Sequence, residues 1–137
     1  MSTMFVLDAS VTLTWAFPDE MHPMATHAAE LLEKGLGSAR VPSLWWFEVR
    51  NILLVSERRG RISAEGTAEF LQSIAPLEIE TEEAKDEGSL FRLARKHRLT
   101  IYDAAYLDLA ARENIQIATL DKALRNAALA EGIPLLA

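Results

Sequence analysis

Four acidic residues stand where their surroundings suggest chemistry: Asp8, Glu48, Asp103 and Asp121. Asp8 directly follows the apolar run 5–7, which is typical of a buried strand, and Asp121 directly follows a strand predicted over residues 115–120. Ligand sites of parallel α/β sheets lie at the carboxyl ends of the strands. If the two strands are neighbours, both carboxylates project over the same edge of the sheet.

Glu48 interrupts the apolar face of a helix predicted over residues 44–59. At helical spacing it lies beside Trp45 and Val49, where an unpaired buried carboxylate would cost several kcal/mol or become protonated. A bound cation would remove that cost, and so would a salt bridge to an arginine elsewhere in the chain. Asn51 lies on the adjacent edge of this face, where it could support the acid or contact a substrate.

Asp103 shares the apolar face of its helix with Tyr106. The spacing Thr100-x-x-Asp103 is also that of a capping box, so capping of the helix N-terminus is the alternative explanation. Asp108 precedes Arg112 by four residues, a pairing that we expect on the solvent face and therefore outside the site.

Each strand-end acid also has a simpler explanation, because Asp8 and Asp121 both stand where an N-cap residue of the following helix would be. A cluster of four carboxylates, however, would repel itself and raise its own pKa values unless cations bind. Oxygen ligands without cysteine suit hard ions, so we expect one or two Mg²⁺ or Mn²⁺ ions. The three histidines fall at no metal-ligand spacing, and we interpret them as surface residues.

The 137 residues suit a single domain, 1–137, and half of them are hydrophobic, enough for one core. The absence of cysteine excludes disulfides, zinc–thiolate sites and cysteine nucleophiles. The net charge of −6 opposes nucleic-acid binding unless acidic residues are grouped to hold cations. No segment resembles a signal peptide or a membrane helix, so we expect a cytoplasmic protein without membrane contact.

Apolar periodicity predicts strands over residues 5–7, 39–41, 77–80, 115–120 and 134–136. It predicts helices over residues 10–17, 22–34, 44–59, 63–74, 81–97, 100–113 and 121–130. Ser43 and Thr81 are expected N-caps, and Gly60 is the expected C′ residue of the long helix. The alternation predicts a mostly parallel sheet with helices on both faces.

Four segments, in this order, resemble the PIN-domain ribonucleases, and specifically the VapC-like toxins of bacterial toxin–antitoxin pairs. They are Val6-Leu-Asp8-Ala-Ser10, Phe47-Glu48-Val-Arg-Asn51, Leu99-Thr-Ile-Tyr-Asp103-Ala-Ala-Tyr-Leu107 and Ala118-Thr119-Leu-Asp121-Lys-Ala-Leu124. They span nearly the whole chain, and the third is the most specific.

The resemblance implies a three-layer α/β/α sandwich with a central parallel sheet. It implies that the four acids named above hold the metal and carry catalysis, with Ser10 and Thr119 as hydroxyl positions nearby. It further implies an RNA substrate, a homodimer and a small antitoxin as partner. The function expected is that of a metal-dependent endoribonuclease, in which the ions neutralise the scissile phosphate and activate a water. Glu48 would hold an ion or orient that water.

Other classes fit the residues less well. A signalling receiver domain needs an acidic pair at the first strand, where this chain offers only Asp8. A haloacid-dehalogenase-like phosphatase needs Asp-x-Asp there, and Ser10 takes the second place. The alternative function is that of a non-catalytic PIN-like or receiver-like domain that binds magnesium and a partner. The cluster Trp45-Trp46-Phe47 exceeds what one helix usually buries, so part of it should face a dimer mate or antitoxin, unless flanking helices cover it.

Overall fold

The computed structural model describes residues 2–137, which form four strands and seven α-helices. The strands are β1 (Thr3–Leu7), β2 (Gly37–Val41), β3 (Ile79–Thr81) and β4 (Gln116–Ala118). The helices are α1 (Ala9–Thr14), α2 (Pro23–Glu33), α3 (Leu44–Arg58), α4 (Ala64–Ile74), α5 (Glu87–His97), α6 (Ile101–Glu113) and α7 (Lys122–Ala130), with a short 3₁₀ turn, η1, at Pro18–Glu20.

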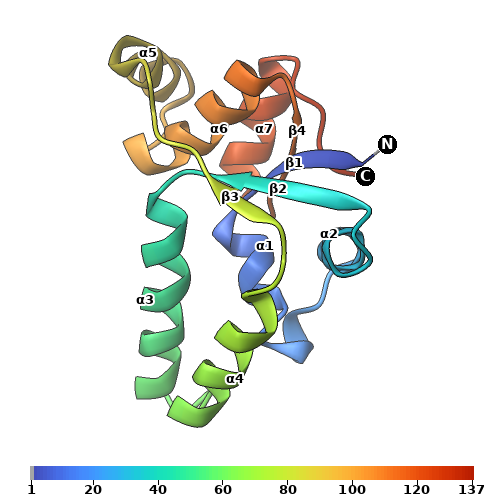
Figure 1. The fold of residues 1–137 in the computed structure, drawn as a ribbon. Helices are drawn as coiled ribbons and strands as arrows, with labels where there is room; N and C mark the ends of the chain where they lie inside the picture. Colours follow the sequence, from blue (N-terminus) through green and yellow to red (C-terminus); the bar gives the residue numbers. More distant parts are fainter. Residues whose placement is uncertain (1) are drawn as a thin grey trace.

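All four strands are parallel, in the order β3-β2-β1-β4. Helices α5, α6 and α7 cover one face of this sheet, and α1 and α2 lie on the other (Figure 1). The expected three-layer α/β/α sandwich is therefore confirmed. Because β1 is central and covered on both faces, its residues Phe5, Val6 and Leu7 are completely buried.

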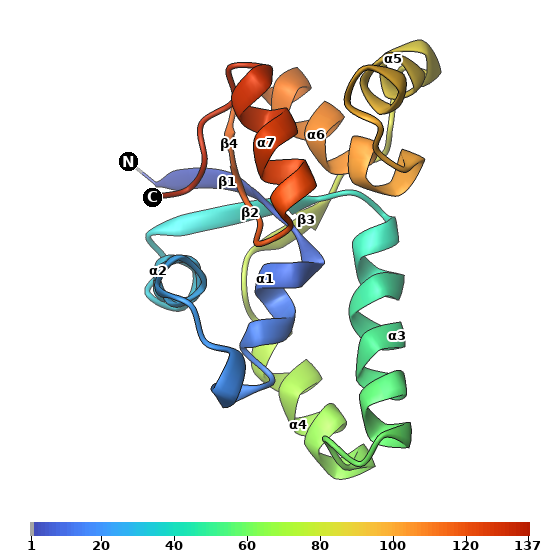
Figure 2. The ribbon, with the colours of Figure 1, turned by 180° about the vertical axis from the view of Figure 1, so that it is seen from behind.

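Helices α3 and α4 form a hairpin that extends away from the sheet, as the view from behind also shows (Figure 2). Gly60 ends α3 with a positive φ of 74°, a conformation that costs glycine little, and it is the C′ residue that the sequence predicts. Ser63 then caps α4 by accepting a hydrogen bond from Gly66 N. Within residues 2–137, no helix has the length and apolar character needed to cross a membrane.

The predicted start of α5 at Thr81 is wrong. Thr81 is the last residue of the edge strand β3, and Glu82 N donates to Val41 O, so this backbone belongs to the sheet. The helix begins at Glu87, where Asp86 accepts a hydrogen bond from Ser89 N. A threonine followed by acids fits a helix start, but pairing with β2 overrides that local signal.

Two smaller predictions also need correction. Ser43 has helical angles and makes no capping hydrogen bond, so its side chain does not cap α3. The strand predicted over residues 134–136 reduces to one parallel bridge between Ile117 and Leu135.

Asp108 is buried, in contrast to the solvent-facing position that the sequence predicts. Helix α5 packs over this part of α6, and Ser89 Oγ donates to Asp108 Oδ1 at 2.6 Å. Arg112 Nη1 donates to Asp108 Oδ2 at 2.9 Å, and its Nη2 donates to the carbonyl of Glu83. The pair therefore fastens α5 and the segment before it to α6.

Replacing Asp108 by alanine should lower the free energy of unfolding by about 2–3 kcal/mol, because the half-buried Arg112 loses its anion and Ser89 loses its acceptor. Urea denaturation measures this. The control is Glu80→Gln, which removes an exposed partner of Arg40 and should cost less than about 1 kcal/mol. Equal effects of the two substitutions would show that the Asp108 network does not fasten the helices.

Candidate active site

Asp8 lies at the carboxyl end of β1, beside the neighbouring strand β4. The register pairs Leu7 with Ala118, and Asp8 N donates to Ala118 O at 3.0 Å. Asp8 occupies the N-cap position of α1, but its side chain makes no capping hydrogen bond. Capping therefore does not explain this carboxylate, which is only 6% exposed.

Two hydroxyl groups hold the Asp8 carboxylate. Ser10 Oγ donates to Asp8 Oδ2 at 2.6 Å, and Thr119 Oγ1 donates to the same oxygen at 2.7 Å. Each hydroxyl also accepts a backbone hydrogen bond, from Leu120 N and Asp121 N respectively. The turn between β4 and α7 is thereby fastened to Asp8, and this turn carries Asp121.

Asp121 is the N-cap of α7, as the simpler explanation of this residue expected. Its Oδ1 accepts a hydrogen bond from Leu124 N at 3.0 Å. The capping role does not remove it from the site, because its charge raises the pKa of both Asp8 and Asp103. Asp121 therefore has two roles: it caps α7, and its charge acts on the other acids.

Glu48 lies in the second turn of α3, half-buried at the rim of a face whose centre is Trp45, Val49 and Leu53. A salt bridge to an arginine would explain Glu48 structurally, but no arginine pairs with it within residues 2–137. Instead, Tyr106 OH donates to Glu48 Oε1 at 2.5 Å. This contact joins α3 to α6 across the site.

Asp103 lies in the first turn of α6, where its own N–H donates to Thr100 Oγ1 at 3.0 Å. Only this half of the capping box is formed, because no hydrogen bond joins the Asp103 carboxylate to Thr100 N within residues 2–137. The Thr100 hydroxyl lowers the pKa of the carboxyl, but burial and the charges of Asp121 and Asp8 outweigh it. The charges of two other acids therefore act on Asp103.

Three of the four carboxyl groups have raised pKa values. For Asp8 the main cause is burial, and the hydroxyls of Ser10 and Thr119 offset part of it. Burial also raises the pKa of Glu48, and the negative charges of Asp8 and Asp103 add to the effect. Tyr106 has a strongly raised pKa, chiefly from burial and then from the charge of Asp8, so its hydroxyl remains a donor. The structure thus brings the four predicted acids into one interacting group.

No cationic side chain forms an ion pair with any of the four acids within residues 2–137. In this part of the chain, no three acidic or histidine side chains lie close enough together to hold a metal ion as they stand. The group is therefore an open cluster of uncompensated carboxylates. Its donor set, which consists of oxygen atoms only, fits Mg²⁺ or Mn²⁺ in type and charge.

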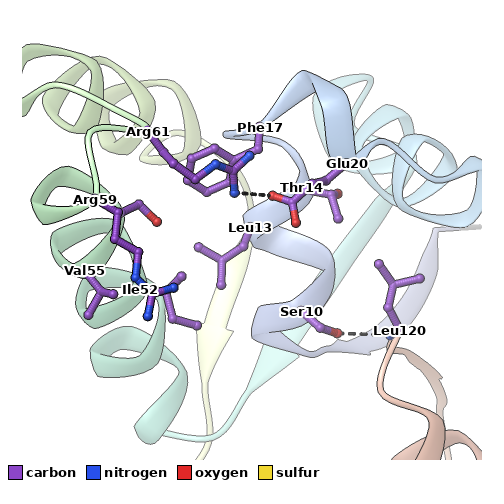
Figure 3. A pocket seen from close by; sticks show the side chains of 11 residues that line it. Ser10, Leu13, Thr14, Phe17, Glu20, Ile52, Val55, Arg59, Arg61 and Leu120 are labelled. Atoms are coloured by element: carbon purple, nitrogen blue, oxygen red, sulfur yellow. Dashed lines mark hydrogen bonds and ion pairs between the residues drawn. The ribbon is translucent and has the colours of Figure 1, made fainter.

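A cleft of about 540 Å³ begins beside the acids and runs between α1 and α3. Ser10 and Leu120 lie at one end, and apolar side chains such as Leu13 and Ile52 line the walls (Figure 3). Among the predicted site residues only Ser10 lines it, so the cleft adjoins the acidic cluster and does not contain it.

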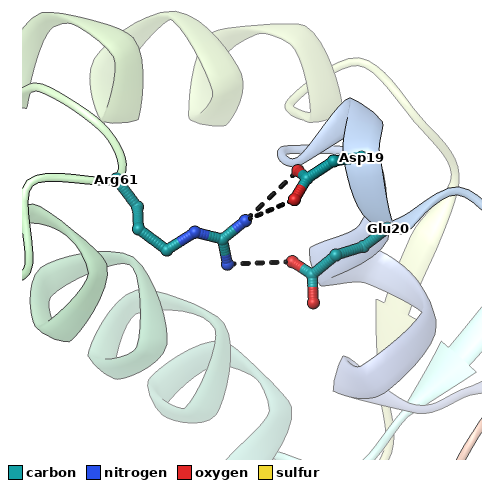
Figure 4. Close-up of polar contacts among 3 residues, drawn as sticks. All are labelled: Asp19, Glu20 and Arg61. Atoms are coloured by element: carbon teal, nitrogen blue, oxygen red, sulfur yellow. Dashed lines mark hydrogen bonds and ion pairs between the residues drawn. The ribbon is translucent and has the colours of Figure 1, made fainter.

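Arg61 closes the far end of the cleft. Its Nη1 donates to Glu20 and its Nη2 to Asp19, each at about 3.1 Å (Figure 4). The guanidinium group also lies 4.4 Å from the ring centre of Phe17. The loop after α3 is thereby tied to η1, which keeps the α3–α4 hairpin beside α1.

The remaining predicted site residue, Asn51, is exposed and makes no side-chain hydrogen bond within residues 2–137. The support for Glu48 comes from Tyr106, which sequence reasoning placed on the Asp103 face but did not assign to the site. The available signal was the spacing of Asp103 and Tyr106, because residues three apart share a helix face and a buried tyrosine hydroxyl needs a partner.

The chain is similar to known proteins in sequence and in fold. Residues 5–129 match the PIN domain family. The chain is 31% identical over 125 residues to Ribonuclease VapC3 of Pyrobaculum aerophilum, covering 87% of this chain and 90% of that protein. The crystal structure of PAE2754 from Pyrobaculum aerophilum superposes with a TM-score of 0.70 at 21% identity, covering 93% of this chain and 87% of that one, which shows a shared fold.

The chain therefore belongs to the PIN-domain family and is VapC-like within it. The relationship to Ribonuclease VapC3 supports a nuclease that acts on RNA. It also favours the PIN-domain interpretation over the receiver and phosphatase alternatives that the acids alone left open.

The raised pKa values predict an unusual pH dependence of the metal-free protein. The folded protein binds protons at Asp8, Glu48 and Asp103 more tightly than the unfolded chain, whose pKa values stay near 3.8 for Asp and 4.5 for Glu. The contribution of these groups to the free energy of unfolding therefore falls as pH rises from about 4 through the raised values. In EDTA, Asp8→Asn should weaken this fall and raise stability at pH 8.

Urea denaturation at pH 5 and pH 8 measures both effects, with the exposed Glu80→Gln as the control. The same difference between the two pH values in wild type and Asp8→Asn would contradict the assignment of charge repulsion to this cluster.

Proposed function

We propose that this chain is a divalent-metal-dependent endoribonuclease and the toxin of a type II toxin–antitoxin pair. Asp8, Glu48, Asp103 and Asp121 hold one or two Mg²⁺ or Mn²⁺ ions. The observation that carries the proposal is that the charges of these acids act on one another and that none of the four has a cationic partner among the described residues. The printed name of the relative, Ribonuclease VapC3, supports the same class of reaction.

A purely structural role explains these acids less well. Several other acids pair with arginine or lysine, as in Asp108–Arg112, whereas the side-chain donors to Asp8 and Glu48 are neutral hydroxyls. Uncompensated charge lowers stability, and bound cations would remove that cost. Net charge matters here too, because an acidic protein gains affinity for phosphates when its carboxylates hold cations.

In hydrolysis of an RNA phosphodiester, a water attacks phosphorus while the bond to the leaving oxygen breaks. When bound, a divalent cation supplies charge neutralisation at the phosphate and makes a nearby water more acidic. Ser10 and Thr119 fix one oxygen of Asp8 by donating to it, and they fix the turn that carries Asp121. Glu48 holds a cation or orients the attacking water. Glu48→Gln distinguishes the two roles, because the substitution should lower metal affinity only if Glu48 is a metal ligand.

Incubating the purified protein with total cellular RNA should give discrete fragments in Mg²⁺ or Mn²⁺ and none in EDTA. Asp8→Asn and Asp103→Asn should each lower the cleavage rate at least about 100-fold, because several kcal/mol of charge stabilisation at the phosphate is lost. Denaturing gel electrophoresis measures the rate. The control is Glu113→Gln, which changes an exposed acid at the other end of α6.

Wild-type rates in either aspartate variant would overturn the assignment of the site. Metal binding without cleavage, measured by calorimetry, would indicate a narrower substrate than total RNA offers, whereas neither binding nor cleavage would favour the non-catalytic, partner-binding alternative. Expression of the wild type alone should slow the growth of the host cells, and expression of Asp8→Asn should not.

We also assign the protein two protein partners, a second copy of itself and a small antitoxin. Trp45 is buried, and its Nε1 donates to Thr12, so this part of the aromatic cluster is core. Trp46 and Phe47 are 49% and 69% exposed, and Leu54 further along α3 is also exposed. An apolar surface of this kind on α3 favours a protein partner.

Light scattering should give twice the 15.2 kDa chain mass, and Phe47→Arg should shift the protein toward the monomer, because an arginine at the apolar contact leaves a charge buried without a partner. Lys122→Ala, on the exposed start of α7, is the control. A wild type that is monomeric at tens of micromolar, or a Phe47→Arg variant that stays dimeric, would show that Phe47 does not lie in a dimer contact.

A further inference from the structure

We propose that Tyr106 is a positioning residue of the acidic site, whose hydroxyl holds the Glu48 carboxylate in the orientation that receives a divalent cation. This inference rests on the proposed function, and it assigns a role to a residue that is not one of the four acids. The contact that carries it is the hydrogen bond from Tyr106 OH to Glu48 Oε1.

Tyr106 is suited to fix a neighbour because the core surrounds it. Its side chain is fully buried and belongs to the hydrophobic core. Glu48, in contrast, is half-buried on α3 and has several rotatable bonds. Since Tyr106 makes the one side-chain hydrogen bond that Glu48 has within residues 2–137, the position of the carboxylate depends on the tyrosine.

The chemical type of the donor matters as much as its position. An arginine at this place would also orient Glu48, but it would cancel the charge that attracts a cation. A tyrosine hydroxyl donates one hydrogen bond and brings no charge. It occupies one oxygen, Oε1, and no described side chain donates to Oε2. The pair therefore keeps an oriented carboxylate with its negative charge available.

Asp8 is held in the same way, although by residues from other elements. Ser10 and Thr119 both donate to Oδ2 of Asp8, and neither brings charge. The acids on β1 and α3 thus share one pattern, in which neutral hydroxyls orient a carboxylate near other carboxylates. Partners that orient the ligands of a metal typically change its affinity about 10–100-fold when they are removed.

The decisive variant is Tyr106→Phe, which removes a single oxygen atom and keeps the ring that fills the core. Calorimetric titration with Mn²⁺ should show affinity about 10–100-fold weaker than in the wild type. The cleavage rate of Tyr106→Phe should be closer to that of the wild type at saturating Mn²⁺ than at limiting Mn²⁺, because the hydroxyl acts through metal binding.

Thr67→Val is the matched control. Thr67 Oγ1 donates to Glu57 Oε2 at 2.7 Å, so it is also a hydroxyl bonded to a glutamate of α3, but far along the helix from Glu48. This variant should change thermal stability without changing Mn²⁺ affinity. Tyr102→Phe, in the same helix as Tyr106, controls for loss of a tyrosine hydroxyl that makes no hydrogen bond within residues 2–137.

A double-mutant cycle then shows whether Tyr106 acts through Glu48. If it does, adding Tyr106→Phe to Glu48→Gln should weaken Mn²⁺ binding no further than Glu48→Gln alone. Independent losses that add, or a Tyr106→Phe affinity equal to wild type, would overturn the positioning role while the nuclease proposal stands. A wild type that neither binds Mn²⁺ nor cuts RNA would overturn both.

Discussion

The carboxylate of Asp8 is the group on which the site depends. It is almost completely buried at the end of a central strand, and its charge is met by hydroxyls from Ser10 and Thr119 and by no cation within residues 2–137. Because those hydroxyls also accept backbone N–H groups from the turn before α7, that turn is fastened to this one acid. Asp121 reaches the site as a consequence.

The parallel sheet explains why acids so far apart in the chain can meet. Strands β1 and β4 are neighbours, although more than a hundred residues separate them, and both end at the same edge. Helix α3 starts shortly after β2, and α6 packs over the central strands, so Glu48 and Asp103 come close enough for their charges to act on that of Asp8. The fold thus brings charges together whose mutual repulsion lowers stability, and the large apolar core supplies the stability that offsets it.

The sequence was sufficient to predict the layers, the parallel sheet and the strand-end position of Asp8 and Asp121, because hydrophobic periodicity and the position of an acid after a strand are local signals. It failed where tertiary contacts decide. Thr81 joins the edge strand because β2 offers hydrogen bonds, and Asp108 is buried because α5 packs over it. The roles of the acids stay predictions, because spacing does not encode what they bind.

Tyr106 shows the same limit most clearly. Its face on α6 was predictable, but its partner, Glu48, lies 58 residues away on another helix, and no pattern within either helix indicates that the two meet. The contact forms only because the fold brings these two residues together. A single sequence therefore does not reveal a residue that orients another residue on a different element, whereas it does reveal an acid at the end of a strand.

The partners of the acids distinguish structural carboxylates from those of the site. Asp108, Glu80 and Glu131 each contact arginine or lysine, which offsets their charge; the pairs of Glu80 and Glu131 also join two segments of the chain. Asp8 and Glu48 receive hydroxyls, which orient a carboxylate but leave its charge in place. The distinction is not complete, since Glu57 also has a hydroxyl partner, but Glu57 lies near the other end of α3, whereas the charges of Asp8 and Asp103 act on Glu48. Oriented charge surrounded by like charge is therefore the combination that separates this site from the other acidic side chains of the molecule.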